Sequence, residues 1–197
     1  MEDGVAGSAE RSVTDPDADL VLLVGQGDRS ACEMLVGRHL NRVTAVAYRV
    51  LGNSADAEDV AQEVFLKVWQ HAVGWRPGQA LFSTWLHTVT INLCRDRLRK
   101  RRESSLDDAG DVADERHDAE KTLQSSRVSH VVDKALANLP ERQRMALTLC
   151  HYQGLTNIEA AEIMEVSVEA VESLLSRARR SLRVQLQDQI ADLRGEP

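Results

Sequence analysis

The chain has 197 residues, of which 43% are hydrophobic, a length that suits one or two small domains and is short for a large enzyme barrel. Only 4% of the residues are aromatic, and Ala, Leu, Val, Arg and Glu dominate, which predicts an all-α protein. The formal net charge is −7, and the three cysteines lie far apart without a C-x-x-C pair, so neither a disulfide framework nor a metal site is indicated.

The N-terminus lacks the basic and apolar segments of a signal peptide, and no uninterrupted apolar run approaches the ~18 residues of a membrane span. We therefore expect a cytoplasmic protein with no membrane insertion of its own.

Charge is sorted along the chain. Residues 1–19 hold six acids and one base, residues 20–102 seven acids and twelve bases, and residues 103–129 eight acids and three bases. A polar, acidic segment with few large apolar residues cannot bury enough surface to offset its chain entropy. We therefore expect a disordered acidic tail (1–19), a helical domain (20–102), a flexible acidic linker (103–128), a second helical domain (129–190) and a short tail (191–197).

The first domain contains a predicted helix over residues 54–69, because its apolar residues recur at the spacing of one buried stripe. Ser54 is placed to cap the start of this helix. Asp59, Gln62, Glu63 and Leu66 lie opposite the stripe. Taken alone, they indicate no more than a solvated acidic face.

A Pro-Gly loop precedes the next predicted helix, which Ser83 or Thr84 is expected to cap. This helix ends in six cations within eight residues, 95–102. Such a density is costly by self-repulsion unless a polyanion or nearby carboxylates compensate it. Three aromatic residues lie beside the run: Trp75, Phe82 and Trp85. The last two fit a core, and Trp75 fits equally a core or a platform on which unpaired bases stack.

The sequence of the second domain predicts a helix-turn-helix. Pro140 fits the first turn of a helix that Gly154 ends. Thr156 and Glu159 have the spacing of a capping box, and Ser167 is placed to cap a second helix after a short break. Two short helices joined in this way place the second helix in the major groove of DNA.

The ordered motifs AEDVAQEVFLKVW, FSTWLHTVTINLCRDRLRKRR and LPERQRMALTLCHYQGLTNIEAAEIMEVSVEAVESLLSRARRSLR resemble those of a bacterial extracytoplasmic-function (group 4) RNA polymerase sigma factor. The resemblance covers the chain from about Asp19 to Leu186. It implies a region 2 domain that binds core RNA polymerase and the minus 10 promoter element, and a region 4 domain that reads the minus 35 element. It implies no catalytic residue and no cofactor, because the polymerase supplies the active site and its magnesium.

The same resemblance divides the candidate site residues into three groups. Core-polymerase contacts are expected from the predicted helix over residues 54–69, at Asp56, Asp59, Gln62, Glu63 and Leu66. Minus 10 DNA contacts are expected at Trp75, Arg76, Asn92, Arg95, Arg99, Lys100, Arg101 and Arg102, with the segment from Trp75 to Ala80 forming a pocket for a flipped base. Minus 35 DNA contacts are expected at Ser167, Glu169, Glu172, Ser173, Ser176, Arg177, Arg179 and Arg180.

The partners implied are core RNA polymerase, promoter DNA and an anti-sigma factor that wedges between the two domains or clasps them. Glu165 stands where many family members have glycine, so the turn either avoids positive φ or tolerates a strain of about 1 kcal/mol. Glu172 and Leu174 stand where many have cations; Glu172 would instead accept from a cytosine amino group.

Two other classes of protein remain as alternatives. One is a sigma-like decoy that sequesters an anti-sigma factor without binding promoters, which would not need the cation clusters. The other is a stand-alone helix-turn-helix repressor, which would leave the first domain unexplained. Redox sensing through Cys32, Cys94 or Cys150 lacks an evident thiolate-stabilising partner.

Overall fold

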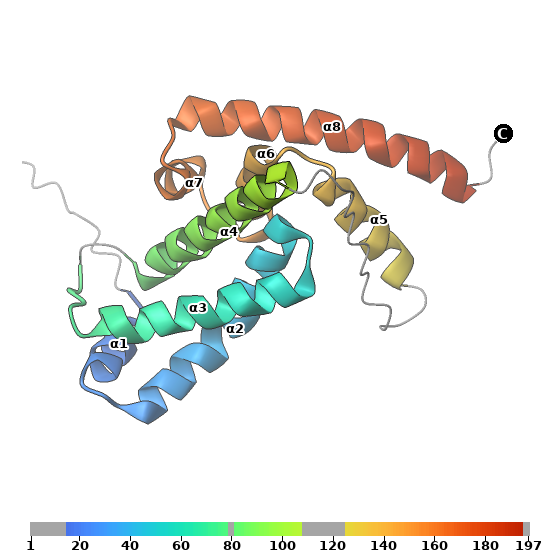
Figure 1. Ribbon diagram of the computed structural model, residues 1–197. Coiled ribbons are helices and arrows are strands. Elements are labelled where there is room, and N and C mark those ends of the chain that lie inside the picture. The colour runs from blue at the N-terminus through green and yellow to red at the C-terminus, as the bar shows by residue number, and fades with distance from the viewer. Residues whose placement is uncertain (1–14, 79–80, 108–124, 195–197) are drawn as a thin grey trace, which may run out of the picture.

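The computed structural model describes residues 15–78, 81–107 and 125–194. Every regular element in these ranges is helical, as predicted. In chain order they are α1 (Ala18–Gly25), α2 (Arg29–Leu51), α3 (Ser54–Ala72), α4 (Phe82–Asp107), α5 (Ser125–Ala137), α6 (Glu141–Leu147), the π-helix η1 (Thr148–Tyr152), α7 (Asn157–Met164) and α8 (Val168–Arg194) (Figure 1). Of the helices described, none is both long and apolar enough to cross a membrane.

The first module consists of α1 to α4, in which α2 and α3 lie side by side and run in opposite directions (Figure 1). Gly52 ends α2 in the left-handed region with φ 71°, and its N–H donates to the carbonyl of Tyr48. Asn53 then caps α3, because its side chain accepts from the N–H of Asp56 at 2.9 Å. The cap is thus Asn53 and not the predicted Ser54, which is the first helical residue.

The second module consists of α5 to α8. The capping box of Thr156 and Glu159 is present at the start of α7. Ser167 accepts from the N–H of Ala170 at 3.2 Å and so caps α8, as expected. Glu165 lies between the two helices in the left-handed region, with φ 55° and ψ 49°. The helix-turn-helix therefore tolerates the strain of a positive φ at a non-glycine residue.

The two modules contact each other directly. α7 lies against α4, while α5, α6 and η1 reach α2, and buried side chains of both modules join one continuous core. Polar contacts across the boundary include Arg102 with Glu141 at 3.2 Å, His87 Nε2 with Gln153 Oε1 at 3.4 Å, and the Arg49 guanidinium 4.2 Å above the ring centre of Tyr152. The modules are therefore closed on each other.

Segment boundaries differ from the sequence prediction in three places. The sequence predicts a disordered tail up to Asp19, yet Asp17 is buried and α1 begins at Ala18. α5 begins at Ser125, inside the predicted linker, and α8 continues to Arg194, inside the predicted C-terminal tail. Residues 1–14, 108–124 and 195–197 of these predicted segments lie outside the described residues.

Candidate nucleic-acid interface

The cations of α4 are divided between two sides of the helix. Arg97 points toward α3, where three carboxylates lie on one side of that helix. Its Nη1 is 3.2 Å from Asp56 Oδ1 and 3.1 Å from Asp59 Oδ2, and its Nη2 is 2.8 Å from Glu63 Oε1. Arg101 also pairs with Asp56. Hydrogen bonding to Glu63 raises the pKa of Arg97, so nearby carboxylates compensate part of the cation run.

Asn92, Arg95 and Arg99 follow each other at helical spacing on a different side of α4, where Asn92 is half-buried and the two arginines are exposed. Arg95 is exposed and donates to Asn92 Oδ1 at 3.4 Å. Arg99 is exposed and pairs within its own helix, with Asp96 at 2.9 Å and Glu103 at 4.0 Å. These local pairs leave the guanidinium groups accessible to a phosphate backbone.

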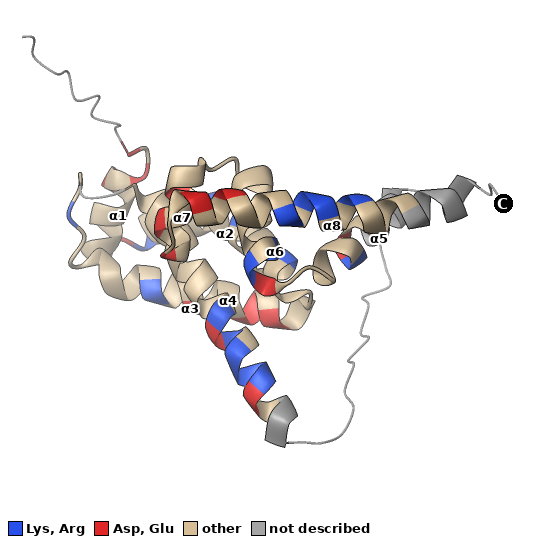
Figure 2. Ribbon diagram, turned by 90° about the horizontal axis from the view of Figure 1, so that it is seen from above, with Lys and Arg blue, Asp and Glu red and all other residues tan. Residues whose placement is uncertain are grey.

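The remaining cations of the predicted minus 10 set have different surroundings. Lys100 is exposed, and Arg102 reaches Glu141 of the second module. Arg101 donates to Asp56 and to the carbonyl of Leu51, so it holds α4 to the α2–α3 connection. In Figure 2, ribbon segments coloured for Lys and Arg alternate with segments coloured for Asp and Glu along this end of α4.

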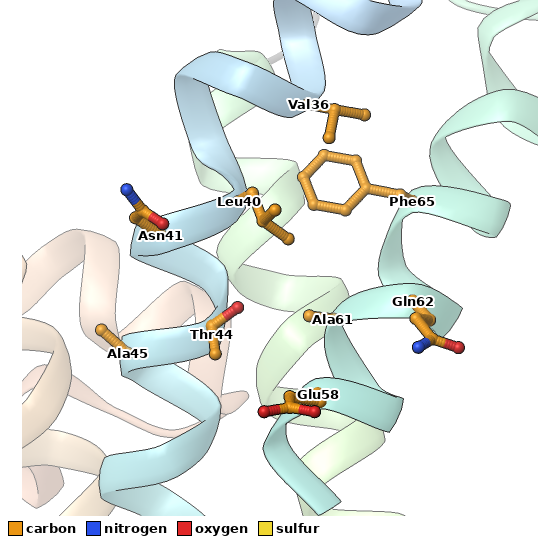
Figure 3. Close-up of a pocket in the computed structure, with 9 residues that line it drawn as sticks. All are labelled: Val36, Leu40, Asn41, Thr44, Ala45, Glu58, Ala61, Gln62 and Phe65. Atoms are coloured by element: carbon orange, nitrogen blue, oxygen red, sulfur yellow. The ribbon is translucent and has the colours of Figure 1, made fainter. Parts of the chain in front are cut away.

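The edge of α3 that faces away from α4 is open and largely apolar. A pocket of about 640 Å³ lies between α2 and α3, with Leu40, Gln62 and Phe65 among its lining residues (Figure 3). Leu66 is 62% exposed and Trp69 is 46% exposed on the same helix. The predicted polymerase set is therefore split: Gln62 and Leu66 lie on this open edge, whereas Asp56, Asp59 and Glu63 face Arg97.

An aromatic cluster surrounds the N-terminal end of α4. Phe82 is buried and stacks on Trp85 with ring centres 5.9 Å apart, and Trp75 meets both rings edge-on at 5.8 and 6.0 Å. Phe82 therefore belongs to the core, as expected, while Trp75 and Trp85 are half-buried at its rim. Trp75 Nε1 is buried and finds no acceptor among the described residues. Arg76 is exposed, and Gln79 and Ala80 of the predicted base pocket lie outside the described residues.

The start of α4 differs from the sequence prediction. The helix begins at Phe82, so Ser83 and Thr84 lie inside its first turn and do not cap it. The N–H of Phe82 instead donates to Asp15 Oδ2 at 2.8 Å. Local sequence patterns do not identify Asp15 as this acceptor, because it lies 67 residues from Phe82, in the segment predicted to be a disordered tail.

The cationic face of α8 is open. Arg177, Arg179 and Arg180 are exposed, and none of them forms an ion pair within the described part of the chain. Ser167, Glu172 and Ser176 are exposed as well, and Ser173 is half-buried. Glu169 is exposed, but hydrogen bonds from its own backbone N–H and from the Ser167 hydroxyl lower its pKa. Its carboxylate therefore accepts hydrogen bonds at the N-terminal end of α8.

The cysteines differ in surroundings. Burial raises the pKa of Cys94 to about 12, and burial also raises the pKa of Cys150, whose thiol lies 3.7 Å from Asn157 Oδ1. Both side chains are protonated thiols near neutral pH, which is unfavourable for redox sensing. Among the described residues, no three His, Cys, Asp or Glu side chains are arranged so that they could hold a metal ion.

Comparisons with known proteins agree with this arrangement. Residues 35–104 match the family Sigma-70 region 2, and residues 129–182 match Sigma-70, region 4. The chain is 35% identical over 164 residues to the ECF RNA polymerase sigma factor SigE of Mycolicibacterium smegmatis, covering 80% of this chain and 63% of that protein. It is 32% identical over 177 residues to the ECF RNA polymerase sigma-E factor of Escherichia coli K12, covering 84% and 92%.

A solved structure shows the same fold. The sigma factor RpoE from Bartonella quintana, crystallised with the anti-sigma factor NepR, superposes with a TM-score of 0.64 at 25% identity, covering 79% of this chain and 96% of that chain. The two family matches cover both modules in the order in which they occur along this chain. The chain belongs to the extracytoplasmic-function group of the sigma-70 family of RNA polymerase sigma factors.

Proposed function

We propose that this sigma factor, working in the cytoplasm, binds core RNA polymerase through its first module and places two separate cationic faces on promoter DNA. The observation that supports this most directly is the pair of open arginine faces, Arg95 with Arg99 on α4 and Arg177 with Arg179 and Arg180 on α8. These arginines stay exposed, and within the described part of the chain Arg99 pairs only with Asp96 and Glu103 of its own helix, so an acidic chain presents two cationic faces that are suited to a polyanion.

We place the polymerase contact on the open edge of α3 and the adjoining pocket. Leu66 and Gln62 are free to meet a partner there, and burying one exposed leucine contributes about 1.5–3 kcal/mol. Asp59 and Glu63 remain partly exposed beside Arg97. They can therefore contribute at the rim of this interface, while Asp56 mainly fastens α3 to α4.

The minus 10 element would lie along Asn92, Arg95, Arg99 and Lys100, with Trp75 and Arg76 at the end where α4 begins. The minus 35 element would lie along α8, where Arg177, Arg179 and Arg180 contact phosphates. Base edges would be read by the exposed polar residues of its first turns, Glu172, Ser173 and Ser176.

An anti-sigma factor is the proposed regulator. RpoE of Bartonella quintana was crystallised with an anti-sigma factor, and the two modules described here are already closed on each other. A protein that binds both modules in this arrangement would keep the chain inactive. The decoy alternative is disfavoured, because a protein that only captures an inhibitor has no use for two open cationic faces.

The function is tested by transcription from a promoter library with purified core polymerase, compared with DNA binding by the protein alone. A sigma factor initiates only with core polymerase, a decoy does not initiate, and a repressor binds a specific site without core. Failure to initiate on any library member would overturn the proposal.

The docking face has its own test. Leu66→Glu should weaken binding to core polymerase by about tenfold or more, because it places a charge in an apolar contact. Val184→Glu is the matched control, since Val184 is an exposed apolar residue of α8 with 56% exposure. Unchanged core affinity in Leu66→Glu, measured by fluorescence anisotropy with both variants folded, would refute the assignment.

A further inference from the structure

Residues 15–25, which we name the N-terminal brace, contact both ends of the connection between α3 and α4. At one end, the Asp15 carboxylate accepts two backbone N–H groups. Its Oδ2 accepts from Phe82 at 2.8 Å and its Oδ1 accepts from Asp17 at 3.0 Å. The segment ahead of α1 is thereby joined to the first residue of α4.

The start of α4 lacks a cap of its own. The residue before the helix is Leu81, whose carbonyl accepts from Thr84 and Trp85 but whose side chain offers no acceptor. The first N–H groups of a helix need acceptors, and a carboxylate is favoured there by the helix dipole. Asp15 meets both needs from a distant part of the chain, so it does for α4 what an N-cap residue does locally.

Asp15 is itself held firmly in place. Asp17 is 2% exposed and pairs with Arg38 and with His39 Nε2, the latter at 2.8 Å. Arg38 also donates to the carbonyl of Pro16 at 3.3 Å, and the His39 ring meets the edge of Phe82 at 5.5 Å. The turn that carries Asp15 is thus fixed to α2.

The other end of the brace meets the end of α3. A Cβ added at Gly25 would lie 2.4 Å from the carbonyl oxygen of Ala72, the last residue of α3. Only a glycine permits this approach, and the residues just after Ala72 begin the connection that carries Trp75 and Arg76. One short segment therefore sets where the connection leaves α3 and where it enters α4.

We propose that the N-terminal brace positions Trp75 and Arg76 for promoter opening, and that Asp15 is the positioning residue at the α4 end. This inference rests on the proposed minus 10 role of Trp75 and Arg76. Asp15 does not contact the DNA; it acts by fixing the path of residues 73–78 and the direction of the first turn of α4. The Asp15 carboxylate thus connects the N-terminal brace to the N-terminal end of α4, beside Trp75 and Arg76.

The test uses the full chain with core polymerase and a duplex promoter selected from a randomised library, carrying 2-aminopurine in the minus 10 element. Asp15→Ala should lower the rate of opening, seen as the 2-aminopurine fluorescence increase, by about fivefold to tenfold. A template already unpaired in the minus 10 element should largely recover transcription, because opening is then no longer required. Asp19→Ala is the matched control, since Asp19 is an exposed acid of the same segment and should behave as wild type.

A second variant distinguishes the positioning of Trp75 and Arg76 by Asp15 from the simple capping of α4. Leu81→Ser supplies a local cap to α4, so Asp15→Ala with Leu81→Ser should regain thermal stability but still open the duplex slowly. If this double variant opens the promoter at the wild-type rate, or if a folded Asp15→Ala does so, the inference is overturned. Arg76→Ala tests the underlying role independently: if it opens the promoter normally, the proposed minus 10 function fails, whatever Asp15 does.

Discussion

Arg97 and Arg99 stand two residues apart on α4 and are expected to differ sharply in what they do. Arg97→Ala removes three ion pairs, with carboxylates that are 24%, 59% and 46% exposed. An exposed pair contributes about 0.2–1 kcal/mol, so we assign about 1 kcal/mol to the two exposed pairs together and about 1 kcal/mol to the pair with Asp56. The variant should therefore lower the free energy of unfolding by about 2 kcal/mol. Because high salt screens such pairs, the loss should shrink to about half in 1 M NaCl.

Urea unfolding followed by tryptophan fluorescence measures this loss in the first module, where the three tryptophans, Trp69, Trp75 and Trp85, all lie. Arg99→Ala is the control, and its stability should stay within about 0.5 kcal/mol of wild type. Promoter binding by the holoenzyme should show the opposite pattern: Arg99→Ala lowers the salt dependence by about one phosphate contact, and Arg97→Ala leaves it unchanged. Equal stability losses in the two variants, or a loss of DNA contacts confined to Arg97→Ala, would refute the division of the cations.

Three further predictions concern single side chains. Glu165→Gly should raise thermal stability by about 0.5–1 kcal/mol, because φ 55° strains any residue with a Cβ; a lower melting temperature would contradict this. Thr148→Val should stabilise the second module by about 1 kcal/mol in chemical unfolding, since the buried Oγ1 has no hydrogen-bond partner among the described residues, and a destabilised variant would argue against it. Burial, aided by the charges of Arg42 and His39, lowers the pKa of His87 from 6.5, so the folded state binds its proton less readily than the unfolded chain and stability falls as pH drops below 6.5. His87→Gln should flatten that part of the stability profile, and an unchanged slope would show that other groups cause it.

Local sequence signals predicted the features that depend on neighbouring residues. The apolar stripe of α3 is buried at Ala57, Val60 and Val64, as its spacing indicated. The capping box of Thr156 and the cap of Ser167 formed because each partner lies three residues away. Glu165 at a turn position also signalled strain, and its φ is positive.

The sequence alone does not predict which side chains of distant segments form ion pairs or hydrogen bonds with each other. Six cations within eight residues look alike, and only the position of α3 shows that Arg97 meets carboxylates while Arg95 does not. Helical spacing did contain part of the signal, because Arg97 and Arg101 are four residues apart and share a side of α4. Asp15 gave no comparable signal, since its partner is set by how α1 and α4 come together.

The contact between α7 and α4 has a geometric consequence for the proposed binding of two separated promoter elements on one duplex. B-DNA rises about 3.4 Å per base pair, so elements centred about 25 pairs apart are separated by about 85 Å. α4 has 26 residues and is therefore about 39 Å long, and α7 touches it directly. Because α8 follows α7 directly after the turn at Glu165, the proposed DNA faces of α4 and α8 lie closer together in the closed chain than the two elements do. The work of parting α7 from α4 is therefore subtracted from the affinity that the complete promoter offers.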